Sequence, residues 1–199
     1  MAFVYSDSIE KQKAREFVLS HVPKTKKTLK VCSLSADNFK FEELVFETNS
    51  NVEIDSFEYD FDAYKNGIKQ YKMLKKTYGS INFKHDNIFN VDLSPYDFVF
   101  LDLCGTINLE TINNIIFSLQ NFKGIVFITL MTNRERKLGD YYKLFTHYKS
   151  KDLEDFRKNG FPRYIELLCG LKQFTERYDY ANKSVNNRSS RMSVYGFKK

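Results

Sequence analysis

The stretch YDFVFLDLCGT, from Tyr96 to Thr106, contains an unbroken apolar run, Phe98 to Leu101, that ends on Asp102. A short run that is apolar at every position is typical of a strand buried on both faces, as in a parallel sheet covered by helices. An acid at the carboxyl end of such a strand lies at the edge where open α/β sheets bind their ligands. This stretch therefore predicts the middle of a doubly wound fold, with its active edge at Asp102.

Turn and cap signals follow this strand. Gly105 is expected to let the chain turn sharply, and Asn108 is a good cap for the amphipathic run from Leu109 to Leu119. We therefore expect a strand over 96–103, then an acidic tip, a turn and a helix.

The length and composition of the chain predict a folded α/β domain. With 199 residues, of which 42% are hydrophobic, the chain can bury a proper core and does not resemble a disordered protein. Its formal charge of +6 favours anionic partners, nucleic acid among them, although a merely soluble basic surface would have the same sign. Its many Lys, Asn, Phe, Tyr and Ile residues indicate an AT-rich genome, such as that of a virus, a plasmid or a small-genome host.

Cysteine usage and the N-terminus indicate a compartment. Cys32, Cys104 and Cys169 are odd in number and widely spaced, which argues against a disulfide framework and for a reducing environment. No C-x-x-C pair is present, so we expect no metal site. The N-terminus carries charges too early for a signal peptide, and no apolar run reaches membrane-spanning length. We expect a cytoplasmic protein that does not enter membranes.

The order of predicted elements indicates one domain over 1–199. It comprises an N-terminal helix within 1–23, a β/α core over 28–170 and a closing hairpin over 172–199. Buried or alternating runs predict strands at 29–34, 52–59, 81–84, 96–103 and 125–130, followed by a β-rich pair at 174–182 and 192–197. The fold class predicted is α/β, a Rossmann-like doubly wound sheet of seven strands. It is mostly parallel, ends in an antiparallel hairpin and carries helices on both faces.

This order resembles the class I fold of S-adenosylmethionine-dependent methyltransferases, and the motif after the second strand supports the resemblance. The sequence EYDFDAY, from Glu58 to Tyr64, is similar to the acid-x-acid-x-x-Ala form of that family. The resemblance implies that S-adenosylmethionine is the cofactor, that Glu58 binds its ribose hydroxyls and that Tyr59 belongs to the same site. A carboxylate can accept two hydrogen bonds from a vicinal diol. The alternative is that Asp60 and Asp62 form a helix-capping cluster.

Two further strand ends match positions of the family. The resemblance implies that Asp86, with Asn87, meets the adenine, and that Asp102 lies beside the methyl donor and the acceptor. Asp102 would orient the acceptor or accept its proton, and is the predicted catalytic residue. Because Asp102 is followed by Leu-Cys-Gly and not by Pro-Pro-aromatic, the tetrad of the amino methyltransferases is absent and base N-methylation is not supported.

The loop after the first strand departs from the family, which has acid-x-Gly-x-Gly there. The corresponding stretch, Cys32 to Asp37, has no glycine. Either Ser33, Ser35 and Asp37 bind the methionine part of the cofactor with an altered loop geometry, which we favour, or the fold has lost its cofactor and serves as a binding scaffold. A nicotinamide-binding dehydrogenase is a weaker alternative, because its glycine fingerprint is also missing and a terminal hairpin is not expected there.

Residues near the predicted active edge suggest how the acceptor binds. Asn133, Arg134 and Arg136 follow the fifth strand, and paired arginines can bind phosphates bidentately. Together with the polar, basic loop 182–191, they favour a nucleic-acid substrate over a small metabolite. Cys104 is a candidate substrate contact. The alternative that it is a nucleophile is weaker, since a cysteine at a buried strand end is usually a small apolar residue.

Overall fold

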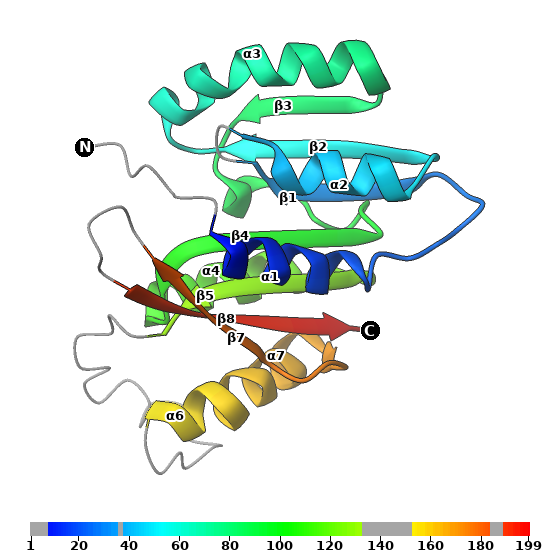
Figure 1. The fold of residues 1–199 in the computed structure, drawn as a ribbon. Helices are drawn as coiled ribbons and strands as arrows, with labels where there is room; N and C mark the ends of the chain where they lie inside the picture. The colour runs from blue at the N-terminus through cyan, green and yellow to red at the C-terminus, as the bar shows by residue number, and fades with distance from the viewer. Residues whose placement is uncertain (1–7, 36–37, 133–152, 184–188) are drawn as a thin grey trace.

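The computed structural model describes residues 8–35, 38–132, 153–183 and 189–199, and these build a single mixed sheet with helices on both faces (Figure 1). The first five strands are β1 Leu29–Leu34, β2 Val52–Glu58, β3 Ile81–His85, β4 Phe98–Thr106 and β5 Ile125–Met131. The C-terminal strands are β6 Lys172–Gln173, β7 Tyr178–Lys183 and β8 Ser189–Lys198.

The strand order is β3-β2-β1-β4-β5-β8-β6, with β7 also paired to β8. Strands β1 to β5 are parallel, and β8 runs antiparallel to β5. The sheet has eight strands in the described residues and not seven, because Lys172–Gln173 pairs with the end of β8 while β7 pairs with its first half. Strands β6 and β7 therefore follow one another along the same edge of β8. The mostly parallel sheet and its antiparallel C-terminal pair were both predicted from the sequence and are confirmed.

Two layers of helices cover the sheet. The first layer consists of α1 Ile9–Leu19, α2 Lys40–Thr48 and α3 Phe61–Tyr78, and the second of α4 Leu109–Leu119, α6 Leu153–Asp155 and α7 Phe161–Cys169 (Figure 1). A π-helical turn, η2 Phe156–Gly160, joins α6 to α7, and a short 3-10 helix, η1 Ile88–Asn90, follows β3.

The central strands divide the core into two clusters. Phe98, Phe100 and Phe127 of β4 and β5 point to the α1 and α2 side, where they join one buried cluster. The alternate residues Val99 and Leu101 join a second cluster with α4 and α7. Because both sets are buried, the unbroken apolar pattern of β4 is explained by burial of this strand on both faces.

Strand β4 ends later than the sequence predicts. Asp102 pairs with Thr129 and Thr106 pairs with Met131, so three residues of β4 lie opposite one residue of β5. This is a bulge, which inserts extra residues into one strand of a pair. Gly105 lies within the strand and has no positive φ, so the expected turn at Gly105 is wrong. Asp102 is the last residue of the regular ladder and not the tip of the strand.

Other local signals were predicted correctly. The carboxamide oxygen of Asn108 accepts a hydrogen bond of 2.9 Å from the backbone of Thr111 and caps α4. Gly79 ends α3 with a φ of 76°, a conformation that glycine adopts without the steric cost of a Cβ.

A glycine at the start of β5 provides a test of strand packing. A Cβ on Gly124 would lie 2.3 Å from the carbonyl oxygen of Asp97, which also accepts the backbone N–H of Ile125. We expect Gly124→Ala to lower the free energy of unfolding by about 2–3 kcal/mol, because the clash is with backbone that carries the β4–β5 ladder. Urea unfolding followed by circular dichroism measures this.

Gly105→Ala is the matched control. A Cβ there would meet only the hydroxyl of Thr111, at 3.9 Å, so we expect a change below about 0.5 kcal/mol. Equal losses in the two variants would show that close approach at Gly124 is not what limits substitution.

Candidate functional site

The carboxyl ends of β2 and β3 are tied together at one edge of the sheet. The backbone N–H of Asp86 donates to the carbonyl oxygen of Glu58, at 3.2 Å. The side chain of Glu58 is half-buried, and its carboxylate accepts the backbone N–H of Asp60, at 2.7 Å. Asp60 in turn caps α3 by accepting from Ala63, at 2.8 Å. The helix-capping alternative is therefore correct for Asp60, while Glu58 lies outside the cap.

Polar and aromatic groups surround these strand ends. Tyr59 is 73% exposed, and its carbonyl oxygen lies 3.0 Å from Nε2 of His85. The carboxylate of Asp86 accepts the backbone N–H of Asn87, at 2.7 Å, and the side chain of Asn87 accepts from Phe89 and so caps η1. Glu58, Tyr59 and Asp86 thus lie at one corner of the sheet, where the strand ends of β2 and β3 are tied together.

Asp102 lies on the α1 side of the sheet. Strands are spaced by about 5 Å, so Asp102 of β4 is about 10 Å from the β2 edge, with β1 between them. Its carboxylate forms an ion pair of 3.3 Å with the ammonium of Lys11, and both side chains are largely buried, with exposed fractions of 14% and 11%. A helix outside the β/α core therefore contributes a cation to the predicted catalytic residue.

The end of β1 contains a buried polar network that the sequence did not predict. Glu42, in the first turn of α2, is fully buried. Its Oε1 accepts the hydroxyl of Ser33 at 2.6 Å and that of Ser56 at 2.9 Å. Ser33 is itself fully buried, so its hydroxyl does not lie at the surface where a ligand would bind. Ser35, two residues further along the chain, is also buried.

Burial raises the pKa of the Glu42 carboxyl above its ordinary value of 4.5, and the hydrogen bonds from Ser33 and Ser56 and the charge of Arg15 oppose that shift. Its second oxygen, Oε2, is buried and has no hydrogen-bond partner. A buried polar atom without a partner is costly. Glu42 is therefore a buried acid with one unsatisfied oxygen, and it contacts Ser33 at the end of β1.

The loop without glycine is shaped by an aromatic residue. Phe39, which precedes α2, has a φ of 51°, a left-handed conformation that is rare outside glycine, asparagine and aspartate. Its ring is fully buried and meets the ring of Phe83 edge-on, with centroids 4.7 Å apart. Burial of the ring holds the backbone in a conformation that a bulky residue would otherwise avoid.

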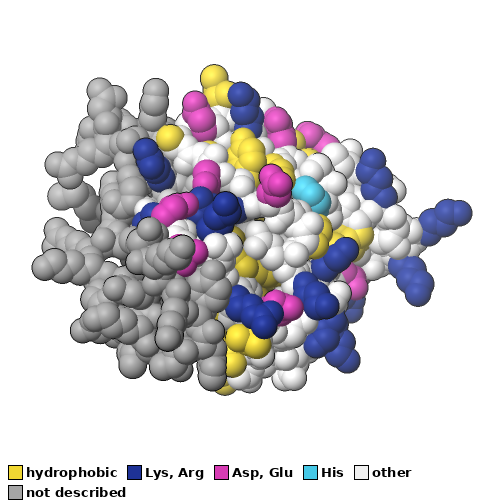
Figure 2. All heavy atoms as spheres, turned by 90° about the horizontal axis from the view of Figure 1, so that it is seen from below, with side chains coloured by type: hydrophobic (Ala, Val, Ile, Leu, Met, Phe, Trp, Pro, Cys, Tyr) yellow, Lys and Arg dark blue, Asp and Glu magenta, His cyan; other side chains and the backbone are white. Residues whose placement is uncertain are grey.

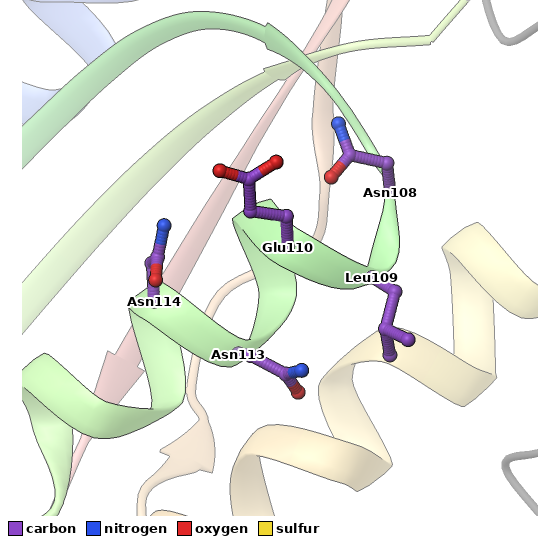
Figure 3. Close-up of a pocket in the computed structure, with 5 residues that line it drawn as sticks. All are labelled: Asn108, Leu109, Glu110, Asn113 and Asn114. Atoms are coloured by element: carbon purple, nitrogen blue, oxygen red, sulfur yellow. The ribbon is translucent and has the colours of Figure 1, made fainter.

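A shallow pocket of about 520 Å³ opens at the start of α4 (Figure 3). It is lined by Asn108, Leu109, Glu110, Asn113 and Asn114. Because α4 follows β4, the pocket lies at the same carboxyl edge as Asp102. Its carboxamides offer both donors and acceptors to a polar ligand.

Several predicted positions lie outside the described residues: Asp37, Asn133, Arg134, Arg136 and the tip of the 182–191 loop. The backbone of Cys104 belongs to β4, but its side chain is not described. Their predicted roles stay predictions.

The fold was compared with solved structures. Precorrin-6y C5,15-methyltransferase from Geobacter metallireducens matches with a TM-score of 0.58 and 14% identity, over 99% of this chain and 94% of that one. Magnesium protoporphyrin IX methyltransferase from Synechocystis, with bound SAH, matches with a TM-score of 0.60 and 11% identity, over 96% of this chain and 84% of that one. This chain has the class I methyltransferase fold.

A third similar structure is a Pyrococcus horikoshii protein provisionally assigned as an RNA methyltransferase, with a TM-score of 0.61 and 13% identity, over 94% of this chain and 84% of that one. No family model and no curated protein matches the sequence. In the class I fold the ligand edge is the one that carries Glu58, Asp86 and Asp102, as the strand order predicts.

Two absences concern the described residues alone. In that part of the chain, no three His, Cys, Asp or Glu side chains group in a way that could hold a metal ion. None of the helices described is long and apolar enough to cross a membrane.

Sequence reasoning missed Lys11 and Glu42. Lys11, Ala14, Arg15 and Val18 are the buried residues of α1 and are spaced as one helical face, which could have placed both cations against the sheet. Glu42 gave no comparable signal, because its partners Ser33 and Ser56 belong to two different strands.

The buried acid predicts a pH dependence of stability. Because its folded pKa is raised, Glu42 stabilises the fold fully below the pKa of the unfolded state, and this contribution is lost as pH rises through the folded pKa. Glu42→Gln removes the charge, so we expect the variant to gain stability over wild type as pH rises above about 4.5, reaching about 1 kcal/mol at pH 8. Thermal unfolding of both proteins between about pH 4 and about pH 8 measures this difference in stability.

Glu47→Gln, on an exposed position of the same helix, is the control and should show no such pH trend. A stability difference between Glu42→Gln and wild type that does not change between about pH 4 and about pH 8 would contradict the raised pKa of Glu42.

Proposed function

We propose that this protein is an S-adenosylmethionine-dependent methyltransferase. The observation that carries the proposal is the half-buried carboxylate of Glu58 at the carboxyl end of β2, in a sheet ordered β3-β2-β1-β4-β5-β8. In this fold that position faces the ligand. The N-cap of α3 is Asp60 and not Glu58. The carboxylate can accept hydrogen bonds from the two ribose hydroxyls.

The residues at this corner fit the rest of the cofactor. The exposed carboxylate of Asp86 offers an acceptor to the amino group of the adenine, and the exposed ring of Tyr59 offers a face on which a purine can stack. Ser35 and the loop that follows it would hold the methionine part. The left-handed backbone at Phe39 provides a sharp turn directly before α2, two residues beyond the stretch in which the resemblance leads one to expect glycine.

When bound, the cofactor supplies a methyl group on a positively charged sulfur, which is already a strong donor. The chain has to bind and orient the acceptor and to take up its proton. We assign both tasks to Asp102, whose carboxylate oxygens can receive the proton from an attacking hydroxyl or amine. A bond from the acceptor atom to the methyl carbon would form as the bond between that carbon and sulfur breaks. The electron pair of the broken bond would stay on sulfur.

We propose nucleic acid as the class of acceptor. The charge of +6 favours a polyanion, and one similar structure is provisionally assigned as an RNA methyltransferase. On the face seen in Figure 2, however, basic side chains lie beside acidic ones next to the residues that are not described. Among the described residues, Arg177 pairs with Glu154 and Asp179. The basic segments that would contact phosphates are therefore 133–137 and 182–191.

The competing function is a non-catalytic scaffold that keeps the sheet and binds a partner. The observation that favours it is the buried, glycine-free end of β1, where Ser33 is engaged by Glu42 and is not open to a ligand.

Calorimetric titration separates the two functions. We expect S-adenosylmethionine and its demethylated product to bind with micromolar affinity and NAD not to bind. Glu58→Ala should weaken both by about tenfold to a hundredfold, because it removes hydrogen bonds to a charged acceptor. Glu53→Ala, at an exposed position of the same strand, is the control and should bind as wild type does. If wild type bound neither compound, the scaffold function would replace the enzyme.

The acceptor class is tested separately by fluorescence anisotropy with single-stranded RNA and DNA. We expect binding that weakens by about tenfold or more between 50 and 200 mM salt, as release of counterions from several phosphate contacts predicts. Affinity that does not change with salt would argue for a small-molecule acceptor.

A further inference from the structure

Helix α1 presents two cations to the sheet. Lys11 and Arg15 lie one helical turn apart on the face that also buries Ala14 and Val18. Each of the two residues, backbone included, is less than 10% exposed. Burying a lysine is costly unless its charge is paired. Lys11 meets this requirement at Asp102, where the 3.3 Å ion pair joins the N-terminal helix to β4 (Figure 1).

This ion pair determines the charge that a ligand meets at the active edge. Asp102 is the last residue of the regular β4–β5 ladder, just before the bulge. With Lys11 against it, the carboxylate is neutralised, and the pair attracts a nearby cation far less than a lone carboxylate would. Both side chains are largely covered, so solvent screens the pair only weakly.

We propose that Lys11 is a specificity-determining residue that sets how the site discriminates a positively charged ligand from its neutral counterpart. The inference rests on the proposed function. The methyl donor carries a sulfonium charge that its demethylated product lacks, and the two differ only by the methyl group and this charge. By neutralising Asp102, Lys11 keeps the two affinities close, so that the product competes well with the donor.

Charge variants of the pair give opposite signatures. In Lys11→Met the carboxylate of Asp102 loses its internal cation, so binding of the sulfonium should improve relative to the thioether by about tenfold. In Asp102→Asn the ammonium of Lys11 is left without this carboxylate, so the same ratio should fall by about tenfold. The double variant restores neutrality and should return the ratio to near the wild-type value.

The experiment is calorimetric titration of wild type and these three variants with S-adenosylmethionine and S-adenosylhomocysteine. Lys13→Met, at an exposed position of α1, is the matched control and should leave the ratio unchanged. Loosening of α1 would weaken both ligands alike and leave the ratio unchanged, or would shift the ratio in the same direction in both single variants. Opposite shifts therefore support the proposal even if thermal unfolding shows a loss of stability.

Two results would overturn the inference, and they differ. If wild type binds both ligands but the two single variants do not shift the ratio in opposite directions, Lys11 is a structural contact and the proposed function stands. If wild type binds neither ligand, the proposed function fails and the inference fails with it.

Discussion

The structure depends on strands that are apolar on both faces. In β4, Phe98 and Phe100 enter one buried cluster and Val99 and Leu101 the other. A strand of this kind is stable only when helices cover both sides, so the connecting helices lie on both faces, α2 and α3 on one and α4 on the other. Because those connections are helical crossovers, β1 to β5 are parallel and their carboxyl ends meet at one edge.

The same arrangement of strands and helices also determines where the buried polar side chains lie. Toward the carboxyl edge the residues that face α1 and α2 change from apolar side chains to Ser33, Ser56 and Asp102. Helices that cover such a surface must bring polar groups of their own, and α2 brings Glu42 while α1 brings Lys11. The edge that is proposed to bind a cofactor is therefore packed against buried polar side chains from α1 and α2.

Much of the fold was predictable because local patterns decide it. The bounds of β1, the cap at Asn108 and the end of α3 at Gly79 depend on residues close in sequence. The end of β4 was mispredicted because a bulge depends on register with β5, which local apolarity does not encode. The Glu58 and Asp86 corner followed from strand order, whereas the Lys11–Asp102 pair joins residues 91 positions apart in sequence and lies on a helix that sequence analysis treated as separate from the core.

The left-handed backbone at Phe39 has an evolutionary consequence. In a glycine-rich loop the turn is an intrinsic property of the loop, so its sequence can drift while the core stays fixed. Here the turn is held by the packing of one ring against Phe83 and Tyr71. Changes in β3 or α3 that move these rings would alter the turn at Phe39 that leads into α2. Selection on the packing of this core and selection on the direction in which α2 starts therefore act on the same few side chains.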